Sequence, residues 1–327
     1  MKVPDTAEAF LRQHGWGDAI VVPVAGDASF RRYFRVSDQQ RHAILMDAPP
    51  PEEDPRPFIA IARYLRSQGF EAPEIFAENL TAGLVLLQDF GDRRMREHLD
   101  HFPDDELPIY ARSIDLLSDL HGKPAAPLAP YDWAQYQREL LLLTEWYCVA
   151  QNLAVDGGGY LTAWREALAP IIAVQSAPVT VLRDYHAENI MLLDNDALGL
   201  LDFQDALQGH RAYDLVSLLQ DARRQVPDAL EAAMIEQYLR ANPDLNPEQF
   251  RAHYAILGAQ RNAKIIGIFT RLWKRDGKLR YLDFLPRMWG MLEKDLAHPA
   301  LAAVSAWFDE NIPMAIRQRP IPGAVAK

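Results

Sequence analysis

Three polar residues in the middle of the chain have the types and the spacing that phosphoryl transfer requires. Asp184 and Asn189 are five positions apart in a segment that leads into an apolar run, and Asp202 follows a second apolar run after a polar turn. The reaction needs a carboxylate that accepts the proton of the attacking hydroxyl, and oxygen ligands that hold Mg²⁺ against the nucleotide phosphates. We therefore predict Asp184 as the base and Asn189 and Asp202 as the metal ligands of an enzyme that uses ATP and Mg²⁺.

Each of these residues alone has an ordinary structural explanation. An Asp in a polar turn between strands is common, and an Asp followed five positions later by an Asn often occurs by chance. The joint arrangement is more specific, because the pair, an apolar strand, a turn and a second strand ending in Asp follow one another in the order that kinases use. The combination favours phosphoryl transfer.

The elements that must position these residues change in type along the chain. Before about residue 90, β-branched and aromatic residues predict strands at 20–24, 30–36, 42–47, near 75 and at 84–87, and a helical pattern that stops at Gly69 predicts a helix at 58–68. Afterwards helical patterns dominate, at 106–121, 133–153, 161–172, 229–239, 247–270 and 281–298. A short β-rich island, residues 179–201, interrupts them next to the polar residues. This order predicts an α+β fold with a β-rich N-terminal nucleotide-binding lobe (1–88) and a mainly helical catalytic and substrate lobe (89–327).

Composition limits the classes of partner. The chain has 327 residues, 49% hydrophobic and 24% charged, as in ordinary globular proteins. Its formal net charge of −11 repels nucleic acid and anionic membranes, and no run of Lys or Arg offsets it. Cys148 is the only cysteine, which excludes an internal disulfide and a cysteine-based zinc site. With no secretory or membrane-spanning segment in the sequence, we expect a cytoplasmic monomer without nucleic acid or membrane partners.

The segment around Asp184 resembles the catalytic loop of the aminoglycoside phosphotransferase family, which commonly reads His-Gly-Asp-Leu-His-Pro-x-Asn. Four positions match that loop and its apolar continuation, namely Asp184, His186, Asn189 and Ile190, whereas Leu182 stands at the first His. Residues 202–206 (Asp-Phe-Gln-Asp-Ala) resemble the metal-binding segment of the family, and residues 120–121 and 211–215 extend the likeness over nearly the whole chain. The resemblance implies a protein-kinase-like bilobal fold and an ATP-dependent phosphotransferase that acts on alcohol groups.

Further stretches resemble one branch of that family, the sugar kinases of bacterial cell-wall recycling. These stretches are residues 26–35, 46–50 and 260–264. Such enzymes phosphorylate the anomeric hydroxyl of N-acetylmuramate and N-acetylglucosamine, so the resemblance implies an amino-sugar substrate, with Arg261 or Lys264 as candidate partners of a lactyl carboxylate. The predicted substrate residues are His186, Glu188, Asp205, Tyr213, Arg261, Asn262 and Lys264. From the residues alone, the polar cluster at 254–264 is explained more often by hydrogen bonds between helices or by an exposed helical face.

The N-terminal part departs from the usual kinase pattern. Kinases place a Lys on the third strand and a Glu on the next helix, but Met46 and Phe58 stand near those positions. Joint replacement by apolar residues avoids an unpaired buried charge. We hypothesise that Arg31 or Arg32 supplies the positive charge to the ATP phosphates; the alternative is that both are solvent-facing. The residues predicted to bind ATP are Ser29, Phe30, Arg31 and Arg32, with Gln88, Asp89 and Phe90 at the turn between the lobes.

Several alternatives stay open at this point. A nucleotide-binding pseudokinase or scaffold fits Met46 and Phe58, and other small hydroxyl acceptors, such as aminoglycosides, choline-like alcohols or homoserine, fit the family. A metal-dependent hydrolase would need several converging His or carboxylate ligands. For His121 we favour a structural place at a helix C-terminus, and for Asp214 a helix N-cap.

Overall fold

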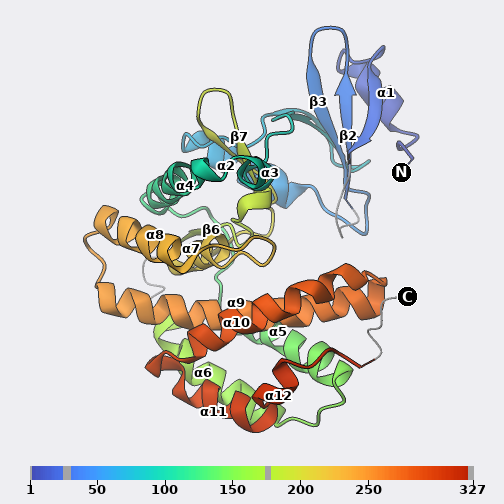
Figure 1. The fold of residues 1–327 in the computed structure, drawn as a ribbon. Helices are drawn as coiled ribbons and strands as arrows, with labels where there is room; N and C mark the ends of the chain where they lie inside the picture. The colour runs from blue at the N-terminus through green and yellow to red at the C-terminus, as the bar shows by residue number, and fades with distance from the viewer. Residues whose placement is uncertain (1, 25–30, 174–177, 323–327) are drawn as a thin grey trace. The chain divides into compact units, whose positions relative to one another are not determined.

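The chain forms two compact units in the computed structural model, which describes residues 2–24, 31–173 and 178–322 (Figure 1). The first unit comprises Met1–Glu106 and Ala187–Ala206, and the second comprises Leu107–His186 and Leu207–Lys327. The lobe boundary that we placed after residue 88 stays a prediction, and these units do not coincide with it, because the chain returns to the first unit at Ala187. Ser29 and Phe30 lie outside the described residues.

The first unit is built on a five-stranded antiparallel sheet in the order β1-β2-β3-β5-β4. Its strands are β1 (Ile20–Val24), β2 (Arg32–Ser37), β3 (His42–Asp47), β4 (Ile75–Asn79) and β5 (Leu84–Gln88). Alternate residues point to one face, so Phe34 and Val36 of β2 meet Leu45 of β3 in a buried cluster that α1 (Ala7–Gln13) covers with Phe10 and Leu11. The strands predicted in this region are confirmed.

A second, smaller hairpin completes the first unit. It consists of β7 (Ile190–Leu192) and β8 (Leu198–Leu200), preceded by the 3₁₀ turn η3 (Ala187–Asn189). The backbone N–H of Leu192 donates to the carbonyl of Arg93, and that of Leu200 donates to the carbonyl of Glu71. The helices of this unit are α1, α2 (Arg56–Ser67) and α3 (Met95–His101), with the short turn η1 (Pro103–Asp105). The hairpin is thus tied to two segments that precede it by about a hundred residues.

The second unit is mainly helical. Its α-helices are α4 (Glu106–His121), α5 (Trp133–Leu142), α6 (Gly157–Ala173), α7 (Ala212–Leu219), α8 (Asp228–Ala241), α9 (Pro247–Asp276), α10 (Leu285–Leu296), α11 (Ala302–Asn311) and α12 (Met314–Arg317). Shorter elements are the π-helix η2 (Leu143–Cys148), the 3₁₀ turns η4 (Leu279–Phe284) and η5 (Pro299–Leu301), and the paired strands β6 (Val179–Val181) and β9 (Leu207–Gly209).

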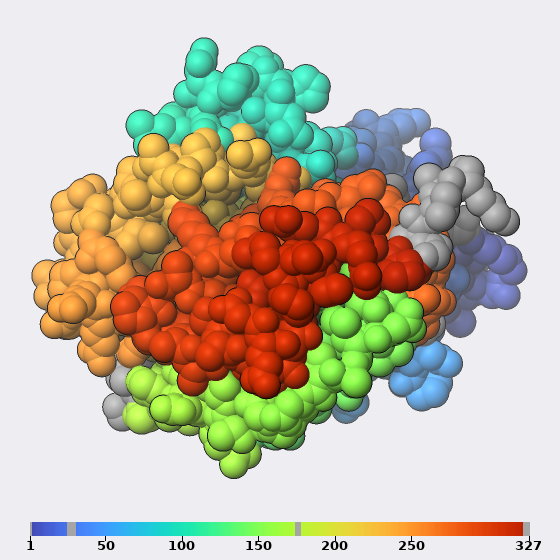
Figure 2. Space-filling model, turned by 60° about the horizontal axis from the view of Figure 1, so that its bottom comes forward, coloured from blue at the N-terminus to red at the C-terminus, as the bar shows by residue number. Residues whose placement is uncertain are grey.

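Long helices pack side by side in this unit. Helix α10 runs along α9 (Figure 1), and α11 packs on α6, so that the red C-terminal helices and the green α6 region share one surface in Figure 2. A β-rich N-terminal part followed by a mainly helical part confirms the predicted α+β class. No helix among the described residues is long and apolar enough to cross a membrane.

Helix α9 is longer than its pattern indicated, which predicted an end at residue 270. It begins where the Asn246 side chain accepts a hydrogen bond from the N–H of Gln249, with Pro247 as its first residue. It ends at Asp276, because Gly277 adopts a left-handed conformation (φ 67°) that a glycine reaches without strain. Capping residues, rather than the apolar pattern, set both ends.

The helix predicted over residues 133–153 is interrupted. Helix α5 stops at Leu142, and the wider π-turns of η2 follow directly. At this point Gly267 of α9 lies against the Leu142 carbonyl so closely that a Cβ on residue 267 would fall within 2.7 Å of the Leu143 nitrogen. The change of helix type coincides with this backbone contact.

Candidate active site

The two predicted metal ligands lie at the open end of the β7–β8 hairpin. The register pairs Ile190 with Leu200, and the N–H of Leu201 donates to the carbonyl of Asn189 at 3.0 Å. Asn189 is therefore opposite Leu201, and Asp202 is the next residue along the chain. Both are partly exposed, and both carry side-chain oxygen atoms.

The backbone of Asp202 adopts an uncommon conformation. Its φ is 55°, in the left-handed region that Asp and Asn tolerate better than most residues. The next residue, Phe203, is buried and stacks on Phe58 of α2 with ring centroids 5.0 Å apart, and the Gln204 amide donates to the Asp202 carboxylate at 3.0 Å. Phe58 stands near the position where kinases have a Glu, and here it packs against Phe203, the residue after the proposed ligand Asp202.

The structure distinguishes the two candidate arginines. The Arg31 side chain is 11% exposed, and its guanidinium lies 3.7 Å from Asp202 Oδ1 and 3.7 Å from Glu53 Oε2. Arg32 is 36% exposed and donates through Nε to Asp47 at 2.7 Å. Arg31, just before β2, and Arg32, its first residue, have different partners, as is expected of neighbouring side chains in an extended chain. Arg31 is the one that faces the proposed metal ligand.

The charges around Arg31 also reach Tyr33. Burial raises the pKa of Tyr33 to about 12, the cation of Arg31 lowers it, and the carboxylates of Asp202 and Glu53 raise it. Tyr33, Arg31, Glu53 and Asp202 therefore form one electrostatic group in the first unit. One guanidinium beside two carboxylates leaves a net negative charge, so an anion can bind here only if a metal cation held by the carboxylates offsets that charge.

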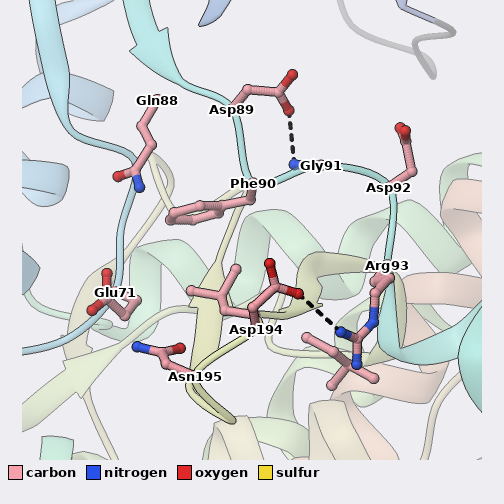
Figure 3. Close-up of a pocket in the computed structure, with 11 residues that line it drawn as sticks. Glu71, Gln88, Asp89, Phe90, Gly91, Asp92, Arg93, Asp194 and Asn195 are labelled. Carbon is pink, nitrogen blue, oxygen red and sulfur yellow. Dashed lines mark hydrogen bonds and ion pairs between the residues drawn. The ribbon is translucent and has the colours of Figure 1, made fainter. Parts of the chain in front are cut away.

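A cavity of about 480 Å³ adjoins the predicted adenine-binding turn (Figure 3). Its lining residues are Glu71, Gln88, Asp89, Phe90, Gly91, Asp92, Arg93, Leu192, Leu193, Asp194 and Asn195. The Asp89 carboxylate accepts from Arg35 at 2.6 Å and from the N–H of Gly91 at 2.8 Å, so its side chain is occupied. The structure thus brings the predicted turn residues Gln88, Asp89 and Phe90 together with the turn of the hairpin.

The ring of Phe90 packs against β8 of the hairpin. A Cβ on Gly199 would lie 2.8 Å from its Cδ2 and Cε2 atoms, so the ring fits there only because residue 199 is a glycine.

Met46, at the usual Lys position, is fully buried in β3. Both positions of the missing Lys–Glu pair are thus part of the apolar interior of the first unit.

The predicted base lies in the second unit, in the loop after β6. Asp214 of α7 accepts from the N–H of Leu182 at 2.7 Å and from that of Arg183 at 2.8 Å, and Ser217 donates to the carbonyl of Arg183 at 2.9 Å. The loop before Asp184 is thereby held by its backbone. Burial raises the pKa of Asp214 to about 7, against the two N–H groups, which lower it.

One structural prediction for this unit is wrong and another is confirmed. Asp214 is not a helix N-cap, because α7 starts after Arg211 and the Asp214 side chain turns to the loop instead. His121 has the structural place expected of it as the last residue of α4, where its Nδ1 is 2.6 Å from the hydroxyl of Tyr238 and burial lowers its pKa to about 3.

Three of the predicted substrate residues lie outside α7 and α9, and they belong to different units. His186 is buried, with Nε2 3.4 Å from Arg223, and burial lowers its pKa. In the first unit, Glu188 pairs with Arg96 of α3, and Asp205 is exposed beside Gln204.

The other four come from α7 and α9. Arg261 donates to Ser217 at 2.9 Å, Asn262 donates to Gln220 and Asp295, and Lys264 donates to Glu139 at 2.9 Å and to the hydroxyl of Tyr213 at 3.2 Å. Hydrogen bonding between helices, the commoner explanation of the cluster, therefore accounts for much of it, and a role in substrate binding stays a prediction.

The sequence reasoning missed Glu139 of α5. Its carboxylate is buried and accepts from Tyr131, Arg183, Gln260 and Lys264. A Glu at helical spacing from the apolar Tyr136 and Leu143 was the available signal, because a charge on an apolar helix face needs partners.

The donor set fits Mg²⁺. Mg²⁺ in nucleotide sites is held by one or two protein oxygens together with phosphate oxygens and water, and Asn189 and Asp202 provide such a pair. Among residues 2–24, 31–173 and 178–322, no three His, Cys, Asp or Glu side chains gather as a metal cluster of their own.

The sequence profile of a family described as "Phosphotransferase enzyme family" matches residues 20–253 of the chain. The chain belongs to this phosphotransferase family. Curated relatives agree: an N-acetylmuramate/N-acetylglucosamine kinase of Caulobacter vibrioides is 38% identical, with 95% of this chain and 97% of the relative covered. One of the same name from Pseudomonas aeruginosa is also 38% identical over 90% of each chain. The family expected from the loop motif is confirmed.

Solved structures share the fold. A choline/ethanolamine kinase family protein from Mesorhizobium loti matches with a TM-score of 0.64 at 17% identity, covering 92% of this chain and 99% of its own. An ADP-bound aminoglycoside phosphotransferase matches with a TM-score of 0.62 at 14% identity, covering 94% of this chain and 99% of its own. These phosphotransferase folds confirm the expected kinase-like fold class.

Proposed function

We propose that this chain is an ATP-dependent kinase that phosphorylates the anomeric hydroxyl of N-acetylmuramate, N-acetylglucosamine or both. The observation that carries the proposal is its 38% identity, over nearly its whole length, with relatives named as N-acetylmuramate/N-acetylglucosamine kinases. Membership of the phosphotransferase family implies ATP as the phosphoryl donor. The retained Asp184, Asn189 and Asp202 support an active enzyme, since a scaffold needs neither the base nor the ligands.

In this proposal each of the predicted residues has a separate task in the reaction. Asp184 accepts the proton of the anomeric hydroxyl, and its loop is held for that task by Asp214 and Ser217. Asn189 and Asp202 hold Mg²⁺, which neutralises charge on the phosphates when bound. Arg31 takes the place of the strand Lys as the cation for the ATP phosphates.

The nucleotide base and the sugar have separate candidate residues. The backbone of Gln88, Asp89 and Phe90 reads the adenine edge, because the Asp89 side chain is already bound to Arg35. For the sugar we retain the seven predicted residues, with Lys264 and Arg261 as the cations available to a lactyl carboxylate. Both have partners inside the second unit, so such contact would add to existing hydrogen bonds.

The test is ADP release with a panel of acceptors. We expect N-acetylglucosamine or N-acetylmuramate to stimulate release and to lose its reducing end, and methyl glycosides of the same sugars, whose anomeric hydroxyl is blocked, to be inert. Stimulation by the methyl glycosides would move the reaction to another hydroxyl. Stimulation only by choline, homoserine or an aminoglycoside would replace the substrate, and ATP binding without turnover on any acceptor would favour a scaffold.

A further inference from the structure

Arg183, the residue before the proposed base, has a backbone conformation that needs support. Its φ is 71°, in the left-handed region where a residue with a Cβ is strained. Three of its groups are bound: the N–H to Asp214, the carbonyl to Ser217, and the guanidinium to Glu139. A strained residue next to a reacting group persists only where its surroundings hold it.

Glu139 receives a full set of donors. Its side chain is 6% exposed, and it accepts from the Tyr131 hydroxyl at 2.5 Å, from Lys264 Nζ at 2.9 Å, from Gln260 Nε2 at 3.0 Å and from the Arg183 guanidinium. A carboxylate offers about four acceptor sites, so this one is saturated. Stability alone is a weak reason for such a cluster, because apolar replacements of buried ion pairs are often neutral or stabilising.

The cluster connects Glu139 with the charge of the base. Lys264 and Arg183 each interact electrostatically with Glu139 and with Asp184. Two cations thus interact with two carboxylates, of which one is buried in α5 and the other lies in the loop. The stacked rings of Tyr131 and Tyr136, with centroids 4.2 Å apart, and the ring of Tyr213 exclude water, which strengthens these interactions.

The helices that carry the cluster are held at a fixed separation. Three residues after Lys264 on α9, Gly267 lies against the carbonyl of Leu142, which is itself three residues after Glu139 on α5. Residues three apart share one helix face. The backbone contact therefore sets how closely Lys264 and Glu139 approach.

We propose that Glu139 is a positioning residue of the phosphoryl transfer reaction, which acts through Arg183 and Lys264 to hold the loop that carries Asp184. The inference rests on the proposed function where kcat is measured, whereas hydrogen–deuterium exchange of the loop tests it without turnover. Glu139 touches no reacting atom in this account. Its effect is on where the base stands, and misplacement of a base by about 1 Å can cost about 100-fold in rate.

The experiment compares Glu139→Gln, Arg183→Gly and the double variant with wild type. Both single variants should lower kcat by about 10- to 100-fold with the KM for ATP unchanged within about twofold, because the ATP-binding residues lie elsewhere. Arg183→Gly is decisive, since glycine relieves the strain at φ 71° and still loses the contact with Glu139. The double variant should be no slower than the slower single one.

Hydrogen–deuterium exchange of residues 181–190 gives the readout that does not depend on turnover. We expect faster exchange there in Glu139→Gln, and no change in Glu145→Gln, a matched control because Glu145 is exposed on the adjoining η2. Unchanged exchange, unchanged kcat in folded variants, or fully additive effects of the two substitutions would overturn the proposal. A wild type inert toward every acceptor would refute the proposed function instead, and the exchange result would still decide the role of Glu139.

Discussion

Single residues near the hairpin end are the ones proposed to hold the nucleotide. The strands predicted after Asn189 and before Asp202 are present, because a short hairpin encodes its own register in local sequence, and the role of the two residues as metal ligands stays a prediction. Spacing left Arg31 and Arg32 undecided, since the segment before β2 gives no register of its own. The structure favours Arg31, which faces Asp202, whereas Arg32 is bound to Asp47.

Replacing Arg31 by Ala should raise the KM for ATP about tenfold or more, because a hydrogen bond to a charged group contributes roughly 1.5–3 kcal/mol. Arg32→Ala should leave that KM within about twofold, although it removes the partner of Asp47. Steady-state kinetics with varied ATP, on variants with wild-type circular dichroism, measures both. An unchanged KM in both variants would refute a phosphate-binding role for either arginine.

The partners of residues that act over long sequence distances could not be found from the sequence. Asp214 binds the backbone of Arg183 from 31 positions away, and Glu139 binds its guanidinium from 44 positions away. Local patterns carry no information about such pairs. The N-cap interpretation of Asp214 failed for this reason: its position at the start of a helix was predictable, whereas the direction of its side chain was not.

At the scale of elements, periodicity predicted most strands and helices, but not where helices change. The two-residue alternation of β2 follows directly from burial of one face. The end of α5 at Leu142 coincides instead with its contact with Gly267 of α9, which lies 125 positions later. A single-chain pattern cannot reveal that contact.

Gly267→Ala should destabilise the protein by about 1–3 kcal/mol, because the added methyl group overlaps the backbone of α5. Gly290→Ala is the matched comparison: it lies inside α10 with no atom within 4 Å of the added Cβ, and should stabilise by about 0.5–1 kcal/mol. Urea denaturation monitored by tryptophan fluorescence compares the two. Equal stability of Gly267→Ala and wild type would show that α5 and α9 are not in close contact.

At the scale of the whole molecule, the order of element types was predictable and the re-entry of the chain was not. Residues 187–206 join the first unit through backbone hydrogen bonds to Arg93 and Glu71. A single boundary after residue 88 assigns these residues to the second lobe and therefore misses their return. The same pairing brings the hairpin turn to the cavity beside Phe90 (Figure 3).

The folding stability of the protein should depend on the buried charge of Glu139 at acidic pH. Lys264 and Arg183 outweigh the cost of burial and lower the pKa of Glu139 to about 2, from 4.5 when unfolded. A lowered pKa stabilises the fold at pH values above about 4.5, and this contribution disappears as the pH falls toward 2. Chemical denaturation from pH 6 to pH 2.5 should show a smaller loss of stability in Glu139→Gln than in wild type. Parallel curves would contradict this assignment.

The role of Asp184 as the base is the claim on which the account depends most. Asp184→Asn should lower kcat for amino-sugar phosphorylation by roughly 10²–10⁴-fold, while ATP binding, measured by calorimetry, stays within about twofold of wild type. Asp119→Asn, on the exposed side of α4, is the control and should be fully active. An Asp184→Asn variant that turns over at the wild-type rate would contradict the account.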